Sequence, residues 1–487
     1  MTLDPEICWR AWSSRDRRFE GRFFAAVTST GIYCRPGCPA RMPARRNVRF
    51  YDSAAAAEAA GFRPCLRCRP ETTQGSPAAQ GTTATVARAL RLIEEGGLDE
   101  GSVESLAGRL GVTSRWLREL FTRQVGASPL EVAMTRRVHF ARRLLDETPL
   151  PLADVAAASG FASARRLRHA IQATFRRPPS ALRRAPASRA SSPLGLRVPA
   201  RAPFDAAPIL AFLAARAIPG VEQVEGRRYR RTSRLGGAGA IVELEALPGA
   251  AHVLLRVPPL PPRELPRLVS RVTRLFDLDA DSAAIAGALA HDAALRAAVR
   301  RGVRVPGAWD AFELAVRALL GQQVSVAAAR TLAGRLVQLC GTPLAAPASG
   351  LSHLFPDAAL VATARLETLG LPRARAASLR AFAAHVADGR LDLEAAEPPD
   401  ALRARLVALP GIGEWTAQYV AMRALREPDA FPAGDLGVRR ALARGGRLPS
   451  ARETAARAES WRPWRAYATV ALWNHEAALA RPRKERP

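Results

Sequence analysis

Four cysteines in two close pairs constrain the N-terminal part of this chain more than any other feature. They follow the patterns Cys34-x3-Cys38 and Cys65-x2-Cys68. Two short pairs can supply four thiolates to one tetrahedral zinc ion. A module of about 70 residues buries only a marginal core, so such an ion would hold it together. We therefore predict one Zn²⁺ in a four-cysteine site, either purely structural or also chemically active, and no pairing role for Cys8 or Cys340.

The overall composition indicates a folded multidomain protein with an anionic partner. The 487 residues exceed what one hydrophobic core organises, and the formal net charge is +28. Only Lys484 is a lysine, so the basic charge also fits a compositional bias toward arginine, and it supports nucleic-acid binding without proving it. No run of about 20 apolar residues and no signal-peptide core is present, which predicts a cytoplasmic protein.

Between two linkers, at residues 73–81 and 185–193, helical periodicity occurs twice. Leu106, Ala107 and Leu110 share one face, Gly111 interrupts, and Trp116, Leu117, Leu120 and Phe121 form a second apolar face. The pattern returns from Val155 to Phe175, which predicts two helix-turn-helix units unless the helix pairs simply pack together. Outward positions on the second helices could meet DNA, namely Arg115, Arg118, Glu119, Arg165, Arg166 and His169.

The spacing of the apolar residues changes after the second linker. Residues 194–198, 229–235, 240–247 and 251–257 alternate like strands, and 206–217 and 266–276 read as helices. This predicts a small α+β domain. From about residue 281 to residue 481 the chain is rich in alanine and leucine and reads as helical throughout.

Inside the helical part, Leu409-Pro410-Gly411-Ile412-Gly413 separates two helix-like runs. Two glycines beside one apolar residue make a tight hairpin, and the next helix begins with its positive dipole end at that turn. Gly411 and Gly413 therefore predict a phosphate cradle, although an ordinary helix-helix turn is the alternative. Asp435 follows 22 residues later in Phe431-Pro432-Ala433-Gly434-Asp435, where its alternative role is a helix N-cap.

The N-terminal motifs resemble two known families. Thr30 to Arg41, Asn47-Val48, Phe50-Tyr51 and Ala60 to Cys68 are similar to the zinc domain of the Ada family of DNA alkylation repair proteins. The resemblance implies that Cys34 irreversibly accepts a methyl group from a DNA methylphosphotriester. The tandem helix pairs resemble the AraC-type regulator domain. Three arginines could hold the phosphate, or simply belong to a charged surface, namely Arg41, Arg63 and Arg67.

Residues 193–481 resemble DNA-3-methyladenine glycosylase II, the AlkA family of the helix-hairpin-helix superfamily. The resemblance implies that Asp435 is catalytic, that Gln322 and Gln323 enter the minor groove, and that a base pocket is lined by Trp415, Tyr419 and Trp473. At the position of Gln323, the best-known member of this family has a leucine. Trp415 stands where strand-cutting relatives carry a lysine, so the expected activity is monofunctional and leaves an abasic site. No iron–sulfur cluster is expected.

Together these features predict a mainly α multidomain protein. The expected domains are a zinc methyl-acceptor domain at 1–75, an AraC-type domain at 82–185, an α+β AlkA N-terminal-like domain at 193–285 and an all-α helix-hairpin-helix glycosylase domain at 286–487. The expected function is repair of alkylated DNA and its regulation. The alternative is a transcriptional regulator whose glycosylase-like half only binds DNA. Expected partners are damaged and promoter double-stranded DNA and RNA polymerase, with a monomeric chain and no membrane.

Overall fold

The computed structural model describes residues 4–16, 19–68, 70, 84–99, 101–184, 193–300, 302–393, 399–443 and 445–480. The chain forms two compact units. The first contains residues 1–202, 251–270 and 278–280, and the second contains residues 203–250, 271–277 and 281–487. Within the described residues, no helix is both long enough and apolar enough to cross a bilayer.

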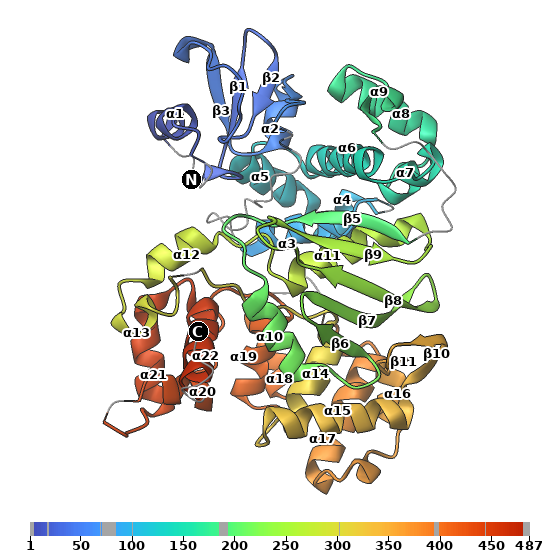
Figure 1. Ribbon diagram of the computed structural model, residues 1–487, viewed down its shortest axis with the longest axis vertical. Helices are drawn as coiled ribbons and strands as arrows, with labels where there is room; N and C mark the ends of the chain where they lie inside the picture. Colours follow the sequence, from blue (N-terminus) through green and yellow to red (C-terminus); the bar gives the residue numbers. More distant parts are fainter. Residues whose placement is uncertain are drawn as a thin grey trace. The chain divides into compact units, whose positions relative to one another are not determined.

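The zinc module opens the first unit and is coloured dark blue in Figure 1. A four-stranded sheet has the order β3-β1-β2-β4. Its centre is the antiparallel pair β1 and β2, in which Ala25 lies opposite Cys34. Trp12, Phe23 and Tyr33 are buried around the sheet. The elements are α1 (Pro5–Ser13), β1 (Phe24–Val27), β2 (Ile32–Cys34), η2 (Arg45–Asn47), β3 (Val48–Tyr51), α2 (Ala54–Ala59) and β4 (Arg63–Pro64).

Seven helices follow, and they confirm the two predicted helix pairs. The pairs are α4 with α5 and α7 with α8, and the long helix α6 lies between them in sequence. Leu117, Leu120 and Phe121 are buried as expected, but Trp116 is 44 % exposed, so its assignment to the buried face was wrong. Consecutive helical residues point about 100° apart, which turns Trp116 away from Leu117. The bounds are α3 (Ala84–Glu94), α4 (Val103–Arg109), α5 (Ser114–Val125), α6 (Pro129–Glu147), α7 (Leu152–Ala158), α8 (Ala164–Phe175) and α9 (Pro179–Leu182).

A buried carboxylate joins the zinc module to helix α6. Glu58 of α2 accepts hydrogen bonds from the Tyr33 hydroxyl at 2.8 Å and the Thr135 hydroxyl at 2.8 Å, and its Oε1 lies 2.7 Å from His139 Nε2. Burial raises the pKa of Glu58, but His139 and the two hydroxyls more than offset this and hold the pKa below its usual range. Because Tyr33 precedes Cys34, the contact begins one residue from the predicted methyl acceptor.

The α+β part contains a five-stranded sheet of order β5-β9-β8-β7-β6. Four strands and both helices were predicted from alternation and periodicity. The sequence analysis missed β6, because Glu222–Glu225 is mostly polar and lacks the β-branched run that marks a strand. The bounds are β5 (Leu194–Pro199), α10 (Ala207–Arg216), β6 (Glu222–Glu225), β7 (Arg228–Leu235), β8 (Ala238–Glu245), β9 (His252–Val257), η5 (Pro262–Glu264) and α11 (Leu265–Leu275).

In the residues that the structure describes, the remainder of the second unit consists of helices, their connecting loops and one small β-hairpin. Strands β10 (Thr342–Ala348) and β11 (Leu351–Leu354) pair antiparallel. The hairpin motif lies between α18 (Pro399–Val407) and α19 (Glu414–Arg423). The other elements are α12 (Ser282–Leu289), α13 (Ala293–Arg296), α14 (Ala311–Leu320), α15 (Val326–Cys340), α16 (Ala358–Thr363), η6 (Leu366–Leu369), α17 (Arg373–Ala387), α20 (Leu436–Ala441), α21 (Ala451–Ala458), η7 (Glu459–Trp461) and α22 (Arg465–Ala480).

Candidate functional sites

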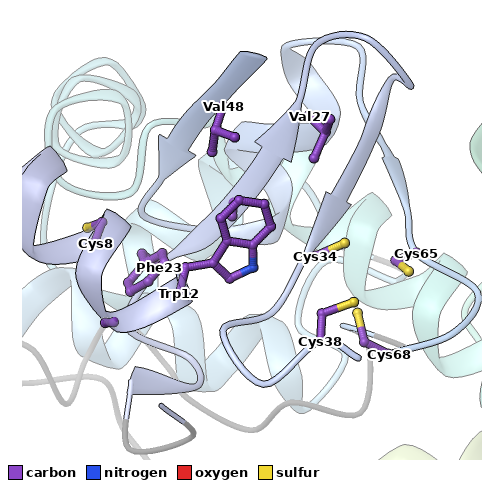
Figure 2. Packing of buried hydrophobic residues seen from close by; sticks show 11 residues of the cluster. Cys8, Trp12, Phe23, Val27, Cys34, Cys38, Val48, Cys65 and Cys68 are labelled. Atoms are coloured by element: carbon purple, nitrogen blue, oxygen red, sulfur yellow. The ribbon is translucent and has the colours of Figure 1, made fainter. Parts of the chain in front are cut away.

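The four paired cysteines come together at one end of the zinc module. Cys34 ends β2, Cys38 lies in the following loop, and Cys65 and Cys68 follow β4. All four are buried, and their sulfur atoms lie within 4.8 Å of one another. Figure 2 shows these sulfurs gathered together, with Cys8 standing apart. Tetrahedral Zn–S bonds of about 2.3 Å place sulfurs roughly 3.8 Å apart, so this arrangement fits the predicted zinc site.

The arginines near these cysteines in sequence differ in their exposure. Arg41 and Arg67 are exposed and Arg63 is half-buried, which is compatible with the prediction that they hold a phosphate. Sequence reasoning missed Arg35, which directly follows Cys34 and forms an ion pair with Glu20 at 3.1 Å. Its position beside the predicted methyl acceptor was the signal available, but so basic a chain offers many such neighbours.

The hairpin in the second unit requires glycine at position 411, whereas position 413 has room for a side chain. Gly411 has φ +77°, and a Cβ placed there would lie 2.2 Å from Ser378 Oγ. Gly413 has φ −90°, and a Cβ there would meet nothing within 4 Å. Ile412 is buried and anchors the turn. Because Gly413 caps α19 without a side chain, the first N–H groups of that helix face an anion without competition from a capping oxygen.

The Asp435 carboxylate caps a helix and also accepts hydrogen bonds from two indoles. It is the N-cap of α20, where Oδ1 accepts from Val438 N at 2.9 Å. The same carboxylate also accepts from Trp473 Nε1 at 2.8 Å and, through Oδ2, from Trp415 Nε1 at 2.9 Å. A helix cap alone needs neither indole. The two tryptophans therefore fix the orientation of a carboxylate that is 9 % exposed.

Aromatic rings from three helices cluster beside Asp435. Trp415 and Tyr419 stack with centroids 5.2 Å apart, and Tyr419 lies 6.1 Å from Trp473 at an angle of 45°. Phe212 of α10 stacks near Trp473 with centroids 6.3 Å apart. The structure thus brings together the three predicted pocket aromatics. Phe212 was missed because nothing in the sequence links a residue of α10 to helices about 200 positions later.

The two glutamines before α15 differ in their surroundings. Gln322 Nε2 donates to the Gly411 carbonyl at 2.9 Å and to Thr416 Oγ1 at 3.0 Å, so its amide ties this loop to the hairpin. Gln323 is exposed and has φ +56°. Of this pair only Gln323 is exposed, so its side chain is available to a DNA groove.

Four family models match successive parts of the chain. The metal binding domain of Ada matches residues 7–71, and a helix-turn-helix domain matches residues 106–185. The AlkA N-terminal domain matches residues 195–310, and the HhH-GPD superfamily of base excision DNA repair proteins matches residues 316–466. These matches confirm the predicted order of zinc, helix-turn-helix, α+β and helix-hairpin-helix parts.

Individual relatives extend this result to the whole chain. A 3-methyladenine DNA glycosylase structure from Archaeoglobus fulgidus matches with a TM-score of 0.51 at 23 % identity, over 58 % of this chain and 99 % of that one, which shows a shared fold. Escherichia coli DNA-3-methyladenine glycosylase 2 is 34 % identical over 56 % of this chain and 95 % of its own. A Mycobacterium tuberculosis protein named probable bifunctional transcriptional activator/DNA repair enzyme AlkA is 44 % identical over 97 % of both chains. The chain therefore belongs to the family of this bifunctional activator and repair protein.

Proposed function

We propose that the second unit removes alkylated bases of the 3-methyladenine type from DNA by hydrolysing the N-glycosidic bond. The observation that carries this is the carboxylate of Asp435, held by two indole N–H groups beside an aromatic pocket. Breaking the bond between sugar and base leaves positive charge on the sugar, which a fixed carboxylate stabilises. The hairpin at Gly411 and Gly413 holds a phosphate of the strand, and Gln323 supports the flipped-out state from the groove.

Water is the nucleophile in this proposal. Trp415 occupies the place of the lysine that would form a Schiff base, and its indole nitrogen already donates to Asp435. Asp435 accepts a proton from the attacking water, so the products are the free base and an intact strand with an abasic site. This supports a monofunctional glycosylase.

The zinc module carries a second proposed activity. A bound Zn²⁺ keeps cysteine sulfur in the thiolate form at neutral pH. The Cys34 sulfur attacks the methyl carbon of a methylphosphotriester, the carbon–oxygen bond breaks, and its electron pair stays on the phosphate oxygen. Arg41, Arg63 and Arg67 hold that phosphate. The product is a methylated Cys34, and we expect the transfer to be irreversible, as the resemblance to the Ada family implies.

Release of free base tests the glycosylase proposal. Purified protein is mixed with methylated duplex DNA, and we expect Asp435→Asn to lower single-turnover release by roughly 100-fold or more. The amide removes the charge and cannot accept from both indoles. Asp357→Asn is the matched control, since Asp357 caps α16 through Leu360 N and no indole hydrogen bond to it is recorded in the described residues. Equal release by wild type and Asp435→Asn would refute the assignment, and no release by wild type would favour the DNA-binding regulator instead.

Peptide mass mapping tests the methyl transfer. After incubation with DNA that carries methylphosphotriesters, we expect one added methyl group on the peptide that contains Cys34. A methyl group on Cys38, Cys65 or Cys68, or on none, would contradict the proposal.

Footprinting with and without methylated Cys34 tests regulation through the helix-turn-helix part. The domain boundaries, the cytoplasmic location, contact with RNA polymerase and the monomeric state stay predictions.

A further inference from the structure

The two helix-turn-helix pairs share one local geometry, so their second helices can be compared position by position. Helices α5 and α8 each have 12 residues, and each N-cap hydroxyl, of Thr113 and of Ser163, accepts from the backbone N–H three positions later. Both helices end at a residue with left-handed backbone, Gly126 with φ +74° and Arg176 with φ +56°. Each residue of α5 therefore corresponds to the residue 50 positions later in α8.

The buried sides of the two helices agree with this correspondence. Leu117 and Leu167 are both fully buried. Because successive helical residues point about 100° apart, the residues two positions before and two positions after each leucine point away from the buried side. These outward residues are exposed in both helices, namely Arg115, Glu119, Arg165 and His169.

The first outward position carries the same residue type in both helices, whereas the second does not. Arg115 corresponds to Arg165, and both can only donate hydrogen bonds. Glu119 corresponds to His169. An ionised carboxylate is negative and only accepts hydrogen bonds, whereas an imidazole can donate. The two helices thus present different chemistry at one and the same place on their exposed sides.

The Glu119 carboxylate is not suited to contact with the DNA backbone. Phosphates repel it, and it opposes the nonspecific attraction that a chain of net charge +28 provides. Arg115 stands four positions before Glu119, yet no ion pair between them is recorded in the described residues. Arg118 instead pairs with Glu104 of α4 at 2.7 Å. The carboxylate of Glu119 is therefore available to the donor group of a base.

The major groove offers a carboxylate only a limited choice of partners. Cytosine presents its N4 amino group there, which is a donor. Guanine presents the acceptors N7 and O6, and thymine presents the acceptor O4, so each of these would repel a carboxylate. Adenine has a donor at N6 but an acceptor beside it at N7, and this pair suits the amide of glutamine or asparagine. Cytosine is thus the base that fits Glu119.

We propose that Glu119 determines the sequence specificity of the helix-turn-helix part by accepting a hydrogen bond from the N4 amino group of a cytosine. The corresponding His169 gives α8 no such negative acceptor, so the DNA bound by the two helices differs at this position. This inference rests on the proposed regulatory function, in which the helix-turn-helix part binds a specific DNA sequence.

Selection from randomised duplex DNA tests the proposal. The full-length protein is used before and after incubation with DNA that carries methylphosphotriesters, and the selected site is compared between wild type and Glu119→Gln. We expect one position of the site to change from cytosine to adenine, because glutamine pairs with N6 and N7 of adenine. In competition at one salt concentration, wild type should prefer the cytosine duplex roughly fivefold or more, and Glu119→Gln should prefer the adenine duplex.

The controls separate base recognition from charge. Glu104→Gln removes another exposed carboxylate of the same helix pair, one that already has a partner in Arg118, and should select the wild-type site. If Glu119→Gln selects the wild-type site, or binds both duplexes more tightly by the same factor, Glu119 acts only through its charge and the proposal is wrong. Wild-type protein that enriches no sequence would instead contradict the proposed regulatory function itself, so the two failures are distinguishable.

Discussion

The zinc cluster of the first unit and the Asp435 pocket of the second are built on opposite electrostatic principles. Four cysteine sulfurs lie within 4.8 Å of one another, and four thiolates so close together repel strongly unless a cation binds between them. Asp435 instead receives three hydrogen bonds from groups that the chain itself supplies. The first site is completed by an ion, whereas the second is preorganised by folding.

We therefore expect the two sites to respond differently to metal removal. Chemistry at Cys34 should depend on metal and on the thiolate state, while chemistry at Asp435 should survive chelation. The two sites also belong to different compact units. A protein that combines them can therefore lose one activity and keep the other.

Metal removal is expected to have the largest effect. Treatment with a strong chelator should unfold the zinc module, because zinc contributes on the order of 10 kcal/mol to small cysteine-rich modules. Limited proteolysis should then cut within residues 1–75, and methyl transfer should stop. Base release should be retained. Zinc content measured by mass spectrometry should be one ion in wild type and in Cys340→Ser, the control thiol outside the cluster, and equal loss of both activities would break the proposed independence.

The indole donors provide the next test. Trp415→Phe should lower base release roughly 10- to 100-fold, because a hydrogen bond to a carboxylate contributes about 1.5–3 kcal/mol. Trp473→Phe should cost less, since Oδ1 still accepts from Val438 N, while Trp415 is the recorded donor to Oδ2. Thermal unfolding of both variants corrects for lost packing. A larger loss in Trp473→Phe would mean that stacking, rather than hydrogen bonding, governs this site.

The residues of both sites could be predicted from the sequence where they lie close together in the chain or belong to one motif. Three residues separate Cys34 from Cys38, and so short a spacing lets both sulfurs bind the same metal ion. Asp435 could be placed near the hairpin because a known motif joins them. The sequence could not separate the N-cap alternative from the proposed catalytic role, because both place the same carboxylate at the start of α20. The indole contact, which a cap alone does not need, became visible only in the structure.

The remainder depended on tertiary contacts that no local pattern encodes. Phe212 and Arg216 come from α10 and Arg423 from α19. The guanidinium carbons of Arg216 and Arg423 lie 3.7 Å and 4.6 Å from the Phe212 ring centroid, and Arg423 donates to the Tyr419 hydroxyl, through packing within the second unit. Each of these side chains alone fits an amphipathic helix. The prediction for Trp116 was wrong for a related reason. Its large apolar side chain suggested that it belongs to the buried face, but helix geometry decides where the side chain points, and Trp116 is exposed.

The smallest expected effect separates the two hairpin glycines. Gly411→Ala should weaken binding of duplex DNA several-fold and lower the unfolding temperature, because its φ is +77° and a Cβ would lie 2.2 Å from Ser378 Oγ. Left-handed backbone alone costs roughly 1–2 kcal/mol for a residue with a Cβ. Gly413→Ala is the matched control, since its φ is −90° and a Cβ there meets no atom within 4 Å. Fluorescence anisotropy with labelled duplex measures both variants. An equal loss of DNA affinity in both variants would contradict this explanation. It would mean that the DNA backbone packs directly against both glycines, so that an added methyl group at either position blocks the phosphate.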